Sequence, residues 1–340
     1  MARTPAGHDK NMNYSNRAFL YGPVGAFLAL ILGLALYWFH ASGQLSERID
    51  ALNGKTIMPG VTLHFSGEEM AGFPFRLDTI FKDLEIDVET DHGLAVWKSE
   101  NFAMHALTYG RPLQVMEAAG KQTLTWTNAK GEHKTFEFIP GLLHASAVED
   151  ATGLTRFDID LVDLGAAEFQ AAELQFHIRK EGDNLEFVFD GNTLHLSDTK
   201  SGFGDTIKSL HLSGEINHGE ALNALRAGAQ DWRPATDAWN AKNGKINLDA
   251  GHVAWGKTGM DVAGEFVLPE RQLRALLSLK MTGVPLEQPG ENDGATGFAV
   301  ALSDWASSNA KDGNVTATFT LGQERGFIGL PGSAKTERVY

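Results

Sequence analysis

Hydrophobic residues follow two different patterns in this chain, one near the N-terminus and one in the remainder. Residues 18–39 read AFLYGPVGAFLALILGLALYWF and contain no charged side chain. A helix over these residues would be about 33 Å long, enough to cross the hydrocarbon core of a bilayer. From Val61 onward, apolar and polar residues alternate instead, as in antiparallel strands that have one covered face.

The alternation recurs in short runs along most of the chain. Turn sequences such as Glu181-Gly182-Asp183-Asn184 and Asp190-Gly191-Asn192 separate the runs and predict hairpins. We therefore expect a mainly β fold, in which an N-terminal transmembrane helix precedes an elongated, curved antiparallel β-sheet domain. Phenylalanines at alternate positions predict the apolar face of this sheet: Phe81, Phe102, Phe136, Phe138, Phe157, Phe176, Phe187 and Phe189, with Phe73 and Phe75 near its start.

Two segments depart from the strand period. Residues 220–230 and 297–307 each place apolar side chains at helical spacing and predict short helical inserts. Residues 283–294 are rich in Pro, Gly and Asp and predict a loop. The expected organisation is a cytoplasmic tail (1–17), the span (18–39), a juxtamembrane linker (40–60), a β-rich domain (61–325) with a sub-boundary near 217–245, and a loosely held tail (326–340).

The charges that flank the apolar run predict its orientation. Arg3, Lys10 and Arg17 precede the run with a single acid, Asp9, so the positive-inside rule places residues 1–17 in the cytoplasm. For a bacterial chain this means a single span of the inner membrane, with the bulk in the periplasm. Tyr21 at one end of the run, and Tyr37 and Trp38 at the other, are typical of interfacial belts. The alternative is a signal peptide cleaved near residues 41–43.

Composition restricts the classes of function. The formal net charge of −14 argues against nucleic-acid binding, because phosphate backbones require basic surfaces. The chain has no Cys, which excludes disulfides, thiol catalysis and cysteine-based metal sites. Stability in an oxidising compartment must therefore come from a large core.

Known catalytic motifs are missing from the chain. Residues 53–56 end like a phosphate-binding loop, but Ile49 occupies the position of its first Gly. None of the twelve His residues has the spacing of a zinc protease motif, although His195, His211 and His218, or His64, His105 and His252, could lie on neighbouring strands. We expect a non-enzymatic protein without a cofactor or a metal site.

The most distinctive stretch outside the apolar run is residues 72–78, GFPFRLD, which places Arg76 and Asp78 on one face of a strand. With this stretch the chain resembles the bacterial envelope family catalogued as domain of unknown function 2125, over roughly residues 45–330. The motif residues are Gly72, Phe73, Pro74, Phe75, Arg76 and Asp78. Further matching stretches are the strand at Trp97, residues 106–109 and 111–113, residues 123–126, the helical insert at 222–239 and residues 254–256.

The chain is also similar, more distantly, to AsmA-like envelope proteins, and this similarity implies contact with lipids or with outer-membrane assembly. Two hypotheses follow. In the first, a curved sheet binds acyl chains or another apolar ligand in a groove, since twenty Phe against five Tyr suggest a dry face. In the second, a closed β core serves as a scaffold that recruits an envelope protein partner. The predicted partners are thus the membrane, a lipid ligand or an envelope protein, and no nucleic acid.

Overall fold

The computed structural model describes residues 17–90, 93–107, 113–128, 130–167, 169–197, 201–222, 225, 231–269, 273–285, 298–321, 327–329 and 337–338. The predicted motif stretch at residues 108–112, most of the predicted loop at 283–294 and much of the predicted tail at 326–340 lie outside these ranges. The helices are α1 (Arg17–Asp50), the 3₁₀ turn η1 (Gly219–Leu222), α3 (Arg233–Ala241) and α4 (Phe298–Asn309).

The strands, in chain order, are β1 (Lys55–Met58), β2 (Val61–His64), β3 (Gly67–Ala71), β4 (Arg76–Lys82), β5 (Leu84–Thr90), β6 (Gly93–Leu107), β7 (Leu113–Asn128), β8 (His133–Ile139), β9 (Leu142–Asp150), β10 (Gly153–Ala166), β11 (Phe169–Glu181), β12 (Asn184–Leu196), β13 (Thr206–Ile216), β14 (Ile246–Trp255), β15 (Thr258–Val267), β16 (Arg274–Thr282), β17 (Val315–Leu321), β18 (Phe327–Gly329) and β19 (Glu337–Arg338).

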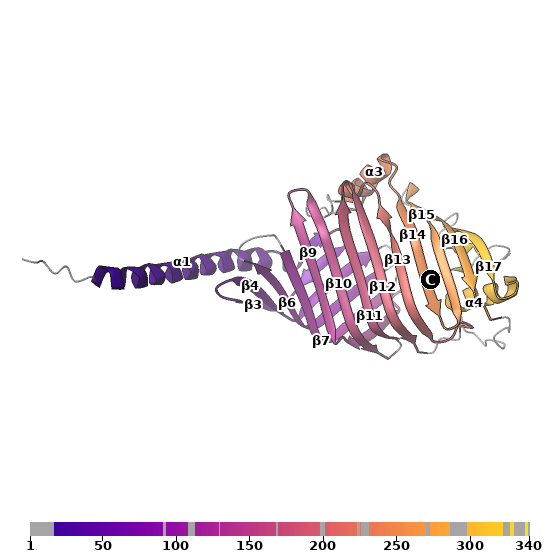
Figure 1. The fold of residues 1–340 in the computed structure, drawn as a ribbon, viewed down its shortest axis with the longest axis horizontal. Helices are drawn as coiled ribbons and strands as arrows, with labels where there is room; N and C mark the ends of the chain where they lie inside the picture. Colours follow the sequence, from indigo (N-terminus) through magenta and orange to yellow (C-terminus); the bar gives the residue numbers. More distant parts are fainter. Residues whose placement is uncertain are drawn as a thin grey trace, which may run out of the picture.

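The long helix α1 extends away from the sheet (Figure 1). It is long and apolar enough to cross a membrane from Tyr21 onward, and very little of its apolar part is buried in the protein. This is consistent with a membrane anchor or with a signal sequence. The helix continues through Asp50, so the first part of the predicted linker at 40–60 is helical.

All strands belong to one antiparallel sheet of 19 strands. From β9 to β17 each strand pairs with the next one in the chain, so this half is a simple meander. The long β6 pairs with β7 on one side and with both β4 and β5 on the other. The next strand, β7, pairs in turn with β8 and β9. The predicted mainly β fold with one large antiparallel sheet is confirmed, whereas its curvature stays a prediction.

One predicted helical insert agrees with the structure, and the other lies mostly outside the described residues. Helix α4 lies where residues 297–307 predicted it. At 220–230 the described residues are those at the end of η1 and Leu225, which is helical; α3 is a further helix later in the chain. Pro234 lies in the first turn of α3, where its missing N–H costs little. Trp239 fixes the helix by burial of its ring and by donating from Nε1 to the carbonyl of Asn217, at 2.6 Å.

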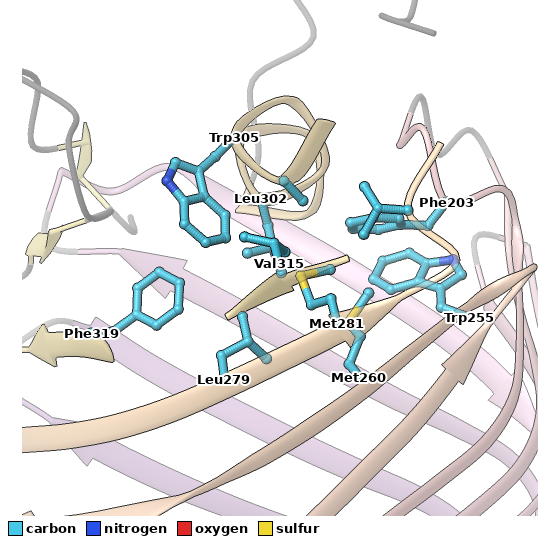
Figure 2. Close-up of a cluster of buried hydrophobic side chains, with 11 residues drawn as sticks. Phe203, Trp255, Met260, Leu279, Met281, Leu302, Trp305, Val315 and Phe319 are labelled. Carbon is cyan, nitrogen blue, oxygen red and sulfur yellow. The ribbon is translucent and has the colours of Figure 1, made fainter. Parts of the chain in front are cut away.

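Two clusters of buried hydrophobic side chains lie at opposite ends of the sheet. In the C-terminal cluster, Leu302, Trp305 and Ala306 of α4 pack on β14–β17 (Figure 2), where the rings of Trp305 and Phe319 meet edge to face at 5.2 Å. In the N-terminal cluster, Ile49 from the end of α1 packs with Phe65, Phe81 and Leu84. Each cluster thus combines one helix with one end of the sheet.

A hydrogen bond also joins parts of the chain that are far apart in sequence. Trp232, just before α3, donates from Nε1 to the carbonyl of Pro59 in the turn between β1 and β2, at 3.1 Å. In the view of Figure 1, N-terminal strands drawn in purple pass behind the middle strands of the meander. The two halves of the sheet therefore meet at this contact, near the strand ends that α3 covers.

The C-terminal cluster predicts a large effect of truncation at its centre. Met281 on β16 has no exposed surface, so Met281→Ala should leave a cavity and lower the free energy of unfolding by about 2–5 kcal/mol. Leu276 on the same strand is 50% exposed, and Leu276→Ala should change it by less than about 0.5 kcal/mol. Thermal melts of both variants test this; equal effects would contradict the assigned burial.

Candidate functional site

The register of the meander creates an apolar face without interruption. Directly paired residues point to the same side of an antiparallel sheet, so each chain of pairs forms a row across it. Three neighbouring rows cross the nine strands β9–β17 and contain only apolar residues or Gly. They are Ala147-Phe157-Ile178-Phe187-Gly214-Leu248-Gly264-Leu277-Phe319, Ala145-Ile159-Phe176-Phe189-Leu212-Gly251-Val262-Leu279-Ala317 and Leu143-Leu161-Leu174-Gly191-Leu210-Val253-Met260-Met281-Val315.

The glycines in these rows make room for large neighbours. A Cβ on Gly214 would come within 2.7 Å of Cζ of Phe187 and 2.0 Å of the carbonyl oxygen of Asn247. The Phe187 ring therefore lies over the backbone of the next strand. Gly at this position keeps the apolar surface continuous across β12 and β13.

The opposite face carries a polar row at the intervening positions. It runs from Glu117 on β7 to Thr316 on β17 through His144, Asp160, Gln175, Asp190, His211, His252, Asp261 and Lys280. Several neighbours in the row are hydrogen-bonded: Nδ1 of His211 lies 2.7 Å from Asp190, and Nδ1 of His252 lies 2.9 Å from Asp261. One face of the meander is thus suited to water and the other is not.

Between the two buried clusters, the apolar face is only half-buried. Helix α4 packs on its β14–β17 end, and the end of α1 packs further along the sheet, on residues of β4 and β5. The phenylalanines of β10, β11 and β12 (Phe157, Phe176, Phe187 and Phe189) are neither buried nor fully exposed, and they belong to neither cluster. A closed core buries its large apolar side chains almost completely. This central part of the rows, on β9–β13, is the candidate site and is called the central apolar face below.

The eight phenylalanines predicted from the sequence fall into three groups. Phe157, Phe176, Phe187 and Phe189 lie on the central apolar face. Phe136 and Phe138 lie on the same side of β8, opposite Leu124 and Gln122 of β7. Phe81 and Phe102 belong to the region under α1, where their ring centroids are 5.7 Å apart and Phe81 is only 7% exposed. Phe81 is therefore part of a closed core, and Phe102 is partly buried against it.

The motif residues 72–78 form a turn that is attached to α1. Phe73 meets Trp38 edge to face at 5.5 Å, and Nε1 of Trp38 donates to the carbonyl of Arg76 at 2.7 Å. Trp38 is only 6% exposed, so it is a packing residue here and not the lipid-facing belt residue that the sequence suggested. Arg76 and Asp78, which the sequence placed on one face of a strand, form an ion pair at 2.7 Å, and His105 contacts the other oxygen of Asp78 at 2.9 Å.

A charged cluster on the polar face has no counterpart in the sequence analysis. Asp158 on β10 is buried, with both carboxylate oxygens engaged. It accepts hydrogen bonds from Arg156, from Arg179 at 2.6 Å and from Ser146 at 3.2 Å, and it contacts Nδ1 of His177 at 2.8 Å. Burial by itself would raise the pKa of Asp158, but the hydrogen bonds from Arg179, His177 and Arg156 outweigh it and lower the pKa to about 2.

The histidines named in the sequence analysis do not converge. His211 and His252 are direct cross-strand partners, yet each contacts a different Asp, and His64 and His105 contact Asp87 and Asp78. Within the described part of the chain, no three His, Asp or Glu side chains are placed to hold a metal ion. The polar row is therefore a set of separate pairs.

Comparison with protein families identifies the chain. The model of a family described as "Uncharacterized protein conserved in bacteria (DUF2125)" matches residues 38–322. The chain belongs to the DUF2125 family. The match begins at Trp38, where α1 contacts the motif turn, and ends just after β17, so it includes both clusters and the central apolar face. Comparisons with curated proteins and with solved structures found no match.

The Asp158 cluster predicts a specific pH dependence. The pKa of Asp158 is about 2 in the folded protein and about 3.8 in the unfolded chain. Its contribution to the free energy of unfolding is therefore complete above about pH 4 and is lost as the pH falls toward 2. Asp158→Asn should lower the free energy of unfolding at pH 7 by about 2 kcal/mol and should flatten its acid dependence below pH 4.

Asp261→Asn provides the matched control, because it breaks an Asp–His pair whose carboxylate is 62% exposed. Exposed pairs contribute little, so the loss should stay within about 0.5 kcal/mol. Unfolding of both variants and the parent at several pH values between 2 and 7 measures the difference. If the free energy of unfolding of Asp158→Asn fell as steeply below pH 4 as that of the parent, the assigned pKa would be contradicted.

Proposed function

We propose that this DUF2125 protein is a non-enzymatic, membrane-anchored periplasmic protein that binds the acyl chains of a lipid on its central apolar face. The observation that carries the proposal is the combination of unbroken apolar rows with incomplete burial at their centre. A soluble domain gains roughly 25 cal/mol for each Å² of apolar surface that it removes from water, so a large half-buried apolar surface indicates a ligand or partner.

The dimensions of the face suit acyl chains. Neighbouring strands lie about 4.8 Å apart, so the rows of the central apolar face, which cross the five strands β9–β13, extend about 19 Å along the hydrogen-bonding direction. One leaflet contributes about half of the roughly 30 Å hydrocarbon core of a bilayer, so each row exceeds the length of a single acyl chain. The rows contain no charged or hydrogen-bonding side chain, which favours a ligand without polar groups along its length.

The position of the anchor supports the same proposal. Ile49 near the end of α1 packs in the N-terminal cluster, and Met104 at its border is paired with Met116 and, through it, with Ala145 in the middle row. The apolar side of the sheet therefore starts at the helix that enters the membrane. The proposed location is the inner membrane, with the N-terminus in the cytoplasm, as the basic residues before the span suggest.

A scaffold that recruits an envelope protein is the second candidate. Its support is the two buried clusters, which give the sheet closed cores at both ends, and exposed apolar residues outside the central apolar face, such as Leu276 at 50% and Ile139 at 62% exposure. In this alternative the polar row, or these exposed residues, would contact the partner. The alternative predicts that a charge on the central apolar face unfolds the protein.

Substitutions at two neighbouring residues of β12 distinguish lipid binding from the scaffold function. Phe189 lies on the central apolar face, and Val188 lies on the opposite face of the same strand, where it pairs with Ser213 and His177. Both are half-buried. Phe189→Asp should leave the protein folded and should abolish lipid that copurifies with the full-length chain, because a carboxylate repels acyl chains from the face. Val188→Asp, the matched control, should retain the lipid.

Mass spectrometry of an organic extract of each purified variant measures bound lipid, and circular dichroism measures the fold. Equal lipid in the two variants would contradict the proposal. Unfolding of Phe189→Asp with a folded Val188→Asp would favour the closed scaffold.

A further inference from the structure

The motif turn of residues 72–75 is held rigidly although its phenylalanines are exposed. The backbone N–H of Arg76 donates to the carbonyl of Gly72 at 2.9 Å. Gly72 has φ of +90°, and a Cβ there would lie 2.9 Å from the carbonyl oxygen of Arg76 and from Asp78. Only Gly fits this conformation without strain. Asp78 is buried and paired, so the turn is fixed on the first strands of the sheet.

Exposed aromatic side chains gather around this turn. Phe73 is 51% exposed and Phe75 is 54% exposed. Phe39, at the end of the uncharged run in α1, is 65% exposed, and its ring centroid lies 6.3 Å from that of Phe73. Leu107 of β6, opposite Arg76 of β4, is 46% exposed. Phe39, Phe73, Phe75 and Leu107 are called the aromatic collar below.

The helix sets the depth of the collar relative to the span. Tyr21 and Phe39 are 18 residues apart in α1, which corresponds to about 27 Å along the axis and approaches the roughly 30 Å thickness of a hydrocarbon core. Phe39 therefore lies where the span leaves the hydrocarbon. Because Phe73 contacts both Phe39 and Trp38, the turn lies at the same level. Arg76, with its side chain 58% exposed, places a cation next to the rings.

We propose that Phe73 and Phe75 insert into the interface of the bilayer that α1 crosses and hold the first strands of the sheet against its surface. Aromatic side chains are enriched at this depth, and a neighbouring basic side chain extends toward the headgroups. Because these rings lie beside the helix that crosses the membrane, the bilayer is the partner closest to them. The inference rests on the anchor included in the proposed function, but it does not depend on lipid bound to the central apolar face.

The lack of native Cys allows a direct test on the full-length chain. Single-cysteine variants carrying a nitroxide spin label are reconstituted into nanodiscs of phosphatidylethanolamine and phosphatidylglycerol. Collision rates with oxygen, which partitions into the membrane, and with a water-soluble nickel chelate give the depth of each label. Phe75→Cys tests the aromatic collar, Leu28→Cys marks the span, and Ser308→Cys marks exposed surface on α4, at the opposite end of the protein (Figure 1).

The label at residue 75 should collide with the nickel chelate several-fold less often than the label at residue 308, and it should lie at a shallower depth than the label at residue 28. Since Phe75 is 54% exposed, its replacement should leave the melting temperature unchanged; if the melt shifts, Leu107→Cys replaces this variant, with the same expectation.

Nickel accessibility at residue 75 equal to that at residue 308, with residue 28 in the hydrocarbon, would overturn the inference and leave the anchor intact. Nickel accessibility at residue 28 itself would overturn the anchor and the inference together.

Discussion

The structure depends on the two-residue alternation of side chains across one hydrogen-bonded meander, with a register shift on β14 that puts Leu248 and Gly251, three residues apart, in neighbouring rows. Because each strand from β9 to β17 pairs with the next, every apolar residue of the three rows falls on one side of the sheet, and the polar row falls on the other. A slip of one residue in any pair would exchange the two sides. The continuity of the apolar face is therefore a consequence of register, and no covering helix is needed to define it.

Near each end of the sheet a helix covers the apolar side, and the side chains beneath these helices are more deeply buried than those at the centre. Under α4, Met260, Met281 and Phe319 of β15, β16 and β17 are buried, and the ring of Phe319 meets that of Trp305. Under the end of α1, Phe65 and Phe81 are buried and their rings meet edge to face. The intervening phenylalanines, on strands of the same pattern, remain half-buried. The chemistry of the side chains is similar throughout, so the difference comes from the helices. Two short closed cores supply stability at the ends, and the central apolar face between them stays half-buried.

The structural features that depend on local periodicity could be predicted from the sequence. The apolar span, most of the strands, the segment that forms α4 and the shared side of Phe157, Phe176, Phe187 and Phe189 follow from spacing along the chain. The hairpin predicted at residues 190–192 is wrong, because β12 continues through them and Gly191 pairs with Leu174 and Leu210. The resemblance carried by residues 72–78 agrees with the family match, although the AsmA-like similarity stays a prediction.

Other features depend on contacts between distant strands. The partners of Asp158 come from β9, β10 and β11, and the polar row requires the register of each pair, which spacing cannot supply. Trp38 has the sequence context of an interfacial residue, but Arg76, 38 positions later, provides the carbonyl that draws it inward. The sequence did not predict α3 as a separate helix, and the contact between its buried Trp239 and the carbonyl of Asn217 could not be inferred from spacing.

The central claim is that the apolar face between the two clusters is open to lipid. It is tested most directly by replacing Phe176 with the photoreactive amino acid benzoylphenylalanine in the full-length chain and irradiating living cells. Phe176 lies in the middle row, away from both clusters. The account predicts that mass spectrometry of the purified product shows a covalent phospholipid adduct. Crosslinks confined to the chain itself, or to another protein, would contradict it.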